Sequence, residues 1–196
     1  MQRTIRFTRR HLPHWEVEAA EYFVTVRCAD SLPVGAIERI AELQRHVARI
    51  PPRSAEFSAL QRQLFRTLEK YLDAGHGACP LRDAACASIL KEELAALADW
   101  DIAVSHFTLM PNHWHALISP GENARHSLSQ IMKRRKGRSA RRIRQTIGGR
   151  GPVWQREWFD RWLRNPQERA RVVDYIRSNP VRAGLVDDWP SHPWTK

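Results

Sequence analysis

Two histidines one residue apart form the group in this sequence with the clearest chemical potential. His113 and His115 flank Trp114 in the stretch "MPNHWHALISP". Alternate side chains of a β-strand project to the same face, so the imidazoles would point together and Trp114 toward a core. Two imidazoles at this spacing can bind one divalent metal, but paired surface histidines show the same pattern. Two nitrogen ligands also leave a site incomplete, so further ligands must come from elsewhere.

The last helical stretch, "NPQERARVVDYIRSNP", offers such groups. Tyr175 and Asn179 are four residues apart and therefore share one helical face. The Asn179 carbonyl can bind a hard cation, and the Tyr175 phenol can act as a nucleophile. The alternative is a core tyrosine and an asparagine that ends the helix before Pro180. Asp174 is a neighbouring candidate ligand, but it points roughly 100° away from Tyr175 around the helix.

Positive charge is concentrated in the half of the chain that contains these groups. Residues 101–196 hold 18 Lys/Arg against 8 Asp/Glu, whereas residues 1–100 hold 14 against 13. The run from Lys133 to Arg150 contains nine basic residues and no acid, and such crowding destabilises a helix unless a polyanion neutralises it. Nucleic-acid contact is favoured over a solvated helix face, through Lys133, Arg134, Arg135, Lys136, Arg138, Arg141, Arg142 and Arg144. The basic arm from Arg3 to Arg10 is a second, weaker candidate.

The elements that must position these groups follow from periodicity and capping residues. The pattern predicts strands at 20–28, 101–110 and 113–119, and helices at 33–50, 54–75 and 83–100. A basic helix at about 125–148, a Trp-rich stretch at 152–164 and a helix ending before Pro180 follow. Periodicity allows helix or strand in the Trp-rich stretch, and extended structure is favoured. The tryptophans of the extended stretch would either fill a core or stack on bases. This order predicts an α+β fold with an antiparallel sheet covered by helices.

Length and composition limit the remaining possibilities. A chain of 196 residues is long enough for one main core, and it has no apolar run long enough to span a bilayer. We therefore expect a soluble, cytoplasmic protein without membrane contact. Its three cysteines form no CxxC pair, which favours reduced, packed thiols over a disulfide framework.

Taken in order, four stretches resemble the REP-associated tyrosine transposases, relatives of the single-tyrosine HUH transposases of IS200/IS605-type insertion sequences. The stretches are "MPNHWHALISP", the basic helix, "VWQREWFDRWLR" and "VVDYIRSNPVRAGLV", and the resemblance is strongest from Thr108 to Val186. It implies a ferredoxin-like antiparallel sheet flanked by helices and a single HUH-type domain over residues 1–196. Two helices at about 34–74 look longer than in the smallest relatives and represent a helical insertion.

The resemblance also implies roles for individual residues. His113 and His115 fall on the histidines that bind a divalent metal, Mg²⁺ or Mn²⁺, and Asn179 falls on a third ligand. Tyr175 falls on the catalytic tyrosine. The implied substrate is single-stranded DNA with a REP-type hairpin, cleaved and rejoined through a 5′-phosphotyrosine, and the implied state is a monomer. Two other functions stay open: a REP-binding protein without turnover, and a metal-dependent nuclease that uses water.

Overall fold

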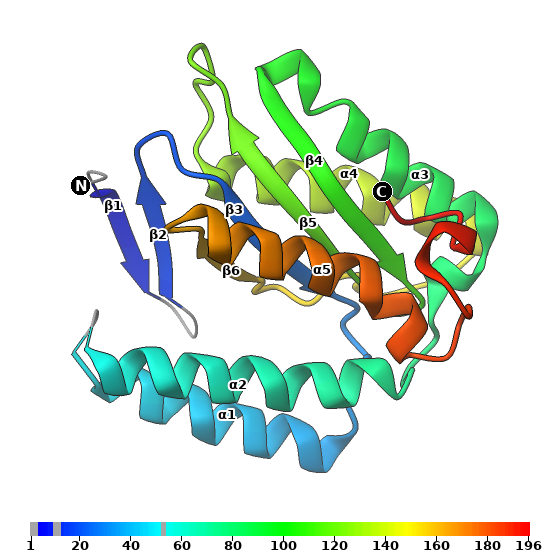
Figure 1. The fold of residues 1–196 in the computed structure, drawn as a ribbon. Coiled ribbons are helices and arrows are strands. Elements are labelled where there is room, and N and C mark those ends of the chain that lie inside the picture. The colour runs from blue at the N-terminus through cyan, green and yellow to red at the C-terminus, as the bar shows by residue number, and fades with distance from the viewer. Residues whose placement is uncertain (1–3, 10–12, 52–53) are drawn as a thin grey trace.

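The computed structural model describes residues 4–9, 13–51 and 54–196 (Figure 1). Its strands are β1 (Thr4–Arg9), β2 (Pro13–Val17), β3 (Tyr22–Arg27), β4 (Ile102–Met110), β5 (His113–Pro120) and β6 (Phe159–Trp162). Its α-helices are α1 (Val34–Arg49), α2 (Ala55–Asp73), α3 (Ala84–Ala95), α4 (Leu128–Ile147) and α5 (Pro166–Arg182). Short 3₁₀ turns lie at Pro80–Arg82, Ala98–Trp100 and Trp189–Ser191.

The central sheet has four antiparallel strands in the order β4-β5-β3-β6. Without the helical pair α1–α2, the chain order is β3-α3-β4-β5-α4-β6, which is the βαββαβ arrangement of a ferredoxin-like fold. The α+β class and the antiparallel sheet predicted from the sequence are confirmed. The β1–β2 hairpin forms a separate two-stranded sheet.

Strand alternation gives the sheet two different apolar faces. Val26, Trp114 and Ile118 pack against α3 and α4, whereas Phe23 and Leu117 pack against α1, α2 and α5. Figure 1 shows α5 and the α1–α2 pair on one side of the sheet and α3 and α4 on the other. His113 and His115 have the parity of Leu117, so they lie beneath α2 and α5 rather than α4.

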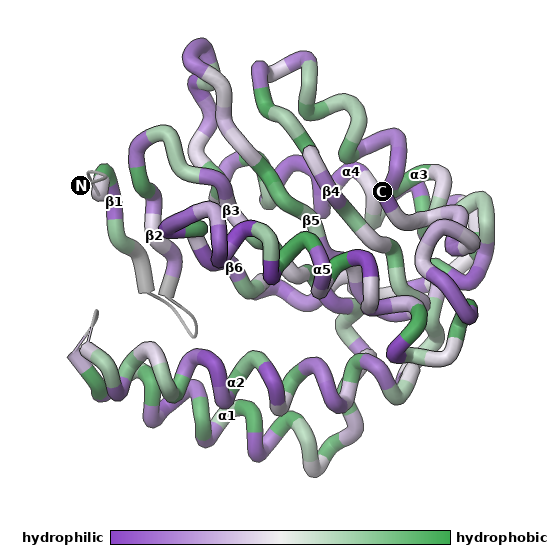
Figure 2. The backbone as a smooth tube through the Cα atoms, in the orientation of Figure 1, coloured by the Kyte–Doolittle hydropathy of each residue, from purple (hydrophilic) through white to green (hydrophobic). Residues whose placement is uncertain are grey.

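The helical pair α1–α2 forms because each helix is amphipathic. Hydrophobic and hydrophilic positions alternate along both helices in Figure 2, with a period that gives each helix one apolar side. Ser54 caps α2 by accepting a hydrogen bond from the Phe57 N–H at 3.0 Å. Leu64, Leu68 and Leu72 then face the sheet and are buried. Because this apolar side packs on the sheet, it determines which α2 side chains lie near β5.

Two predicted helix ends were wrong. The third helix stops at Ala95 and a 3₁₀ turn occupies Ala98–Trp100 before β4. Helix α5 runs through Pro180 to Arg182 instead of ending before it. Proline lacks the N–H that would bond to residue 176, but the next turn still closes, because the Ala183 N–H donates to the Asn179 carbonyl at 3.0 Å. The prolonged helix keeps Asn179 in regular helical geometry.

No helix within the described ranges is both long and apolar enough to cross a membrane.

Candidate active site

The two histidines of β5 lie side by side in the interior. Both side chains are fully buried, and their ring centroids are 4.8 Å apart. The β4–β5 turn at Pro111 and Asn112 brings β5 back beside β4, and Thr25 of β3 is the register partner of His115. Trp114 points to the opposite face, where it is also buried. The sheet register therefore determines the direction of both imidazoles.

Hydrogen bonds to Nδ1 hold each imidazole in a defined orientation. His113 Nδ1 lies 2.8 Å from Asn112 Oδ1, and His115 Nδ1 lies 2.8 Å from Thr25 Oγ1. The Asn112 amide nitrogen donates to the His76 carbonyl at 2.9 Å, which turns Oδ1 toward His113. An amide oxygen only accepts, so His113 carries its proton on Nδ1 and keeps the Nε2 lone pair free. This is the tautomer that a metal-binding histidine requires.

Burial keeps both imidazoles neutral at physiological pH. It lowers the pKa of His113 to about 3, with a further contribution from the neighbouring His115. It also lowers the pKa of His115 to about 3. Neutral imidazole is the form that binds a metal, so neither side chain needs to lose a proton first.

Glu69 of α2 completes a group that the sequence analysis missed. One ligand atom from each of Glu69, His113 and His115 lies within 4.8 Å of the other two. His115 Nε2 is 3.4 Å from Glu69 Oε2. Burial raises the pKa of Glu69 to about 7, although His113, Arg182 and Asn179 act to lower it. Glu69 stands within an otherwise ordinary amphipathic helix, so no spacing in the sequence marks it as part of the site.

Tyr175 of α5 faces this group. Its hydroxyl donates a hydrogen bond to Glu69 Oε2, and its ring centroid is 5.4 Å from that of His115. The ring also packs edge-on against Phe23 at 5.8 Å. Arg182 lies over the other side of the phenol, 4.7 Å from the ring centroid. The phenol is thus fixed between α2 and the sheet, with its oxygen directed at the buried carboxylate.

Asn179 lies one helical turn beyond Tyr175 and is fully buried. Its amide lowers the pKa of Glu69, which places it beside that carboxylate. Among the described residues, neither its oxygen nor its nitrogen has a hydrogen-bond partner of regular geometry, and the same holds for Nε2 of His113 and of His115 and for Glu69 Oε1. Asp174, the alternative ligand, is exposed. Buried polar atoms without partners are costly, so their convergence fits a site that binds a cation.

The basic helix α4 lies on the other face of the sheet, against α3 (Figure 1). Arg135 and Lys136 are buried, contrary to a role as exposed phosphate contacts. Lys136 Nζ donates to the carbonyls of Gln155 and Arg156 at 2.6 and 2.7 Å. Glu93, also buried, lies 3.2 Å from each of three guanidinium groups, those of Arg135, Arg138 and Arg142. Much of the basic run therefore stabilises the α3–α4 contact.

Within the described ranges, four of the eight predicted DNA-binding residues are at least partly exposed and have no ion pair with a carboxylate. Lys133, Arg134 and Arg141 are exposed, and Arg144 is partly buried and reaches the Gly151 carbonyl at 3.2 Å. Arg134 also lies over Trp100, 5.0 Å from the ring centroid. From the N-terminal arm, Arg6 is exposed, while Arg3 and Arg10 lie outside the described residues.

Comparison with known proteins identifies the family. Residues 83–179 match the family described as "Transposase IS200 like". The chain belongs to the IS200-like transposases. The segment typical of these transposases contains His113, His115 and Tyr175 and ends at Asn179. Glu69 lies before it, in the helical pair. No curated protein matches the chain.

Two solved structures resemble this IS200-like transposase. One is described as "Structure of the REP associates tyrosine transposase bound to a REP hairpin" and has a TM-score of 0.51 at 16% identity. That match covers 97% of this chain and 81% of the other chain, and it shows that the two share a fold. The other is a putative transposase from Deinococcus radiodurans R1, with a TM-score of 0.39, 15% identity and coverage of 81% and 89%.

Proposed function

We propose that this transposase is a metal-dependent single-strand DNA endonuclease and strand transferase. It acts on DNA with a REP-type hairpin through a 5′-phosphotyrosine at Tyr175. The observation that carries the proposal is the meeting of the Tyr175 hydroxyl with Glu69, His113 and His115 in one buried group. The likeness in fold to a transposase bound to a REP hairpin supports the choice of substrate.

The four residues that would hold a divalent cation are His113, His115, Asn179 and Glu69. Their donor set of two imidazole nitrogens with carboxylate and amide oxygens suits a divalent cation, and the oxygens favour Mg²⁺ or Mn²⁺. A bound cation would draw charge from the non-bridging oxygens of the phosphate under attack. Thr25 and Asn112 keep the imidazole nitrogens directed inward, so the site is organised before the cation arrives.

Tyr175 supplies the nucleophile. A phenol has a pKa near 10, so it needs a proton acceptor to attack at neutral pH. Glu69 accepts the Tyr175 hydrogen bond and is placed to take that proton. The Tyr175 oxygen then bonds to phosphorus as the bond from phosphorus to the 3′ oxygen breaks. The departing oxygen takes up a proton and becomes a 3′-OH, and attack by a 3′-OH on the phosphotyrosine reverses the reaction without ATP.

The decisive experiment incubates the protein with Mn²⁺ and labelled single-stranded DNA that carries a REP hairpin, followed by a denaturing gel. We expect a covalent adduct that is lost in Tyr175→Phe and in His113→Ala. Tyr71→Phe, which alters another partly buried tyrosine on α2, is the matched control and should keep the adduct. Cleavage without adduct would identify a nuclease that uses water. Hairpin binding without any cleavage by folded protein would identify a binding protein.

A further inference from the structure

We propose that a groove between α2 and α5, ending at Tyr175, binds the single strand of DNA that carries the phosphate to be cleaved. We call it the arginine groove. The inference rests on the proposed function, because it assigns the approach path to the same tyrosine. It concerns a surface formed partly by the inserted helix α2, on the opposite side of the sheet from the basic helix α4 (Figure 1).

The arginine groove has a volume of about 870 Å³ and is lined by α2, β6, the N-terminal half of α5 and Trp15 of β2. Helices α2 and α5 run in the same direction along it (Figure 1). The α5 side presents residues at helical spacing, Gln167, Arg171 and Tyr175. At the end of the groove Tyr175 meets Glu69, and one turn further along α2 Asp73 is 3.1 Å from Arg182. These two contacts join α2 to α5 at the end of the groove where the nucleophile lies.

Five arginines make the groove strongly positive: Arg62, Arg66, Arg161, Arg164 and Arg171. Its two acids are already engaged, because Glu168 pairs with Arg161 and the buried Asp160 pairs with His14. Within the described ranges, the other four arginines have no ion pair with an acid. Burial lowers the pKa of Arg161, Glu168 opposes this, and the charges of Arg164 and Arg62 lower it further, so the three guanidinium groups are close enough to repel one another. Like charges held together across a cleft create a field that attracts a polyanion.

Aromatic rings lie between these charges. Trp162 lies at the β6 edge of the groove, half-buried and packed against the core on the α3–α4 side, with the Arg164 guanidinium 5.3 Å from its ring centroid. Phe65, also half-buried, packs against Phe159 with ring centroids 4.8 Å apart. Guanidinium groups for phosphates and ring faces for bases are the combination with which proteins bind single strands without reading a duplex.

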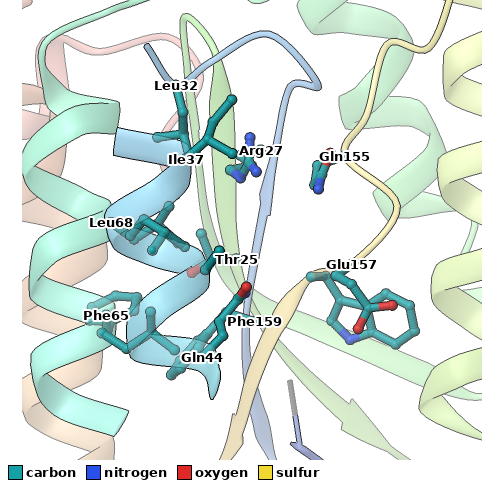
Figure 3. A pocket seen from close by; sticks show the side chains of 14 residues that line it. Thr25, Arg27, Leu32, Ile37, Gln44, Phe65, Leu68, Gln155, Glu157 and Phe159 are labelled. Carbon is teal, nitrogen blue, oxygen red and sulfur yellow. The ribbon is translucent and has the colours of Figure 1, made fainter. Parts of the chain in front are cut away.

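The helical pair is not packed tightly against the sheet behind these rings. A smaller pocket of about 120 Å³ lies there, and Figure 3 shows Phe65 and Phe159 beside Thr25 in its wall. Thr25 is the residue that orients His115. The aromatic wall of the groove thus adjoins Thr25, which orients one of the histidines proposed to bind the metal. The proposed path of the DNA therefore leads to the proposed active site.

Binding measurements on the full chain test the arginine groove separately from catalysis. We would measure fluorescence anisotropy of labelled single-stranded DNA in EDTA, which prevents turnover, with Arg62→Ala/Arg66→Ala. The matched control is Arg45→Ala/Arg49→Ala, which removes two exposed arginines from α1 outside the groove. We expect the groove variant to bind about tenfold more weakly. The slope of log affinity against log salt concentration should become shallower by about 1.4, because two phosphate contacts are lost and each contact with a single strand contributes about 0.7.

The control variant should keep both the affinity and the slope of the unaltered protein, and thermal melting verifies that each variant is folded. Photo-cross-linking with 5-iodouracil DNA provides a second readout, with the expected cross-links at Trp162 or Phe65. Unchanged affinity and slope in the groove variant, or cross-links confined to α4, would overturn the inference. If RNA of the same sequence bound more tightly than the DNA, the assignment of the groove as a DNA site would also be overturned.

The outcomes also separate this inference from the proposed function. If the groove variant loses affinity but the unaltered protein forms no tyrosine adduct, the groove is upheld and the phosphotyrosine reaction is not. If adduct forms and the groove variant binds DNA normally, the phosphotyrosine reaction is upheld and the groove is not. If both are correct, adduct formation by the groove variant falls at limiting DNA and recovers at saturating DNA.

Discussion

The hydroxyl of Tyr175 donates a hydrogen bond to the carboxylate of Glu69, which joins α5 to helix α2. Glu69 also lies 3.4 Å from His115, so one carboxylate contacts both the proposed nucleophile and a proposed metal ligand. Helix α2 is thus part of the proposed site. His113, His115 and Asn179 are fully buried there.

The role of Glu69 predicts a large loss of activity in Glu69→Gln. The amide keeps the size of the side chain but cannot accept the Tyr175 proton in the same way. We expect the rate of adduct formation to fall by about 10² to 10⁴, the range for loss of a general base. Single-turnover kinetics at saturating DNA measure this rate. Glu42→Gln, an exposed change on α1, should leave it unaltered, and a Glu69→Gln rate within twofold of normal would contradict the role.

Cation binding should stabilise the folded chain. A cation held by the folded state alone adds about 2.7 kcal/mol when its concentration is 100 times the Kd. We therefore expect Mn²⁺ to raise the melting temperature and EDTA to reverse the rise. His113→Ala should abolish the effect, whereas His46→Ala, on the exposed side of α1, should preserve it. An equal rise in the two variants would show that the cation binds elsewhere.

Thr25 should act through His115 rather than by touching DNA. Thr25→Val preserves the shape of the side chain but leaves His115 Nδ1 without its partner. We expect Mn²⁺ affinity, measured by titration calorimetry, to weaken about 10- to 100-fold, as is typical when the group that orients a ligand is lost. Thr25→Ser restores the hydroxyl and should recover most of the affinity. A Thr25→Ser variant as weak as Thr25→Val would indicate a packing role instead.

Glu93 should be one of the main supports of the α3–α4 contact. It is buried and faces three arginines, so its removal leaves positive charge without compensation. We expect Glu93→Gln to lower the free energy of unfolding by about 3 kcal/mol, the scale for breaking a buried ion pair. Glu92→Gln removes an exposed partner of Arg142 and should cost less than about 1 kcal/mol. Denaturant titration compares the two, and equal losses would contradict the prediction.

These arginines show where sequence reasoning reached its limit. The capping residues Ser54, Asp83 and Asn165, strand alternation in β5 and the four-residue spacing of Tyr175 and Asn179 are local patterns, and the structure follows them. The partner of a charge is not local. Glu93 lies some forty residues before the arginines that it binds, so a run that looks free in sequence is partly neutralised in the fold.

Glu69 was missed for the same reason. Its position on α2 is ordinary for an amphipathic helix, and only the packing of that helix against β5 and α5 gives it a role. The burial of Lys136 likewise depends on the neighbouring Trp-rich stretch, whose backbone carbonyls accept its hydrogen bonds, and that of Arg135 depends on Glu93 and the Ala96 carbonyl. Local signals thus predicted the helices and strands. The complete set of proposed metal ligands, and the basic side chains that remain free to contact DNA, could be identified only from the three-dimensional contacts.

The docking of the β1–β2 hairpin should weaken as pH rises. His14 of β2 is buried between Asp160 of β6 and Glu157, and its ring lies over Trp158 with centroids 4.5 Å apart. Burial alone would lower the pKa of His14, but hydrogen bonds and attraction from Asp160 and Glu157 outweigh it and raise the pKa above 6.5. Burial also raises the pKa of Asp160. Both groups therefore hold protons more tightly in the folded state than in the unfolded state.

A histidine with a raised folded-state pKa contributes stability that is complete below about pH 6.5 and is lost as pH rises through the raised value. The raised pKa of Asp160 acts in the same direction. His113 and His115 act oppositely, and their contribution, like that of Glu69, is the same in the variants compared. We expect the free energy of unfolding of the unaltered protein to fall more steeply between pH 6.5 and 8.5 than that of a variant without this pair.

The double variant His14→Gln/Asp160→Asn replaces the pair with neutral groups that can still form hydrogen bonds, and it should flatten this dependence. Denaturant titration at several pH values measures the difference between the two proteins. His46→Gln, an exposed change on α1, is the matched control and should retain the full slope. Because the histidine pair, Glu69 and the cysteines are common to all three proteins, their titration cancels in the comparison. Parallel curves for the double variant and the unaltered protein would show that His14 is not charged in the folded state.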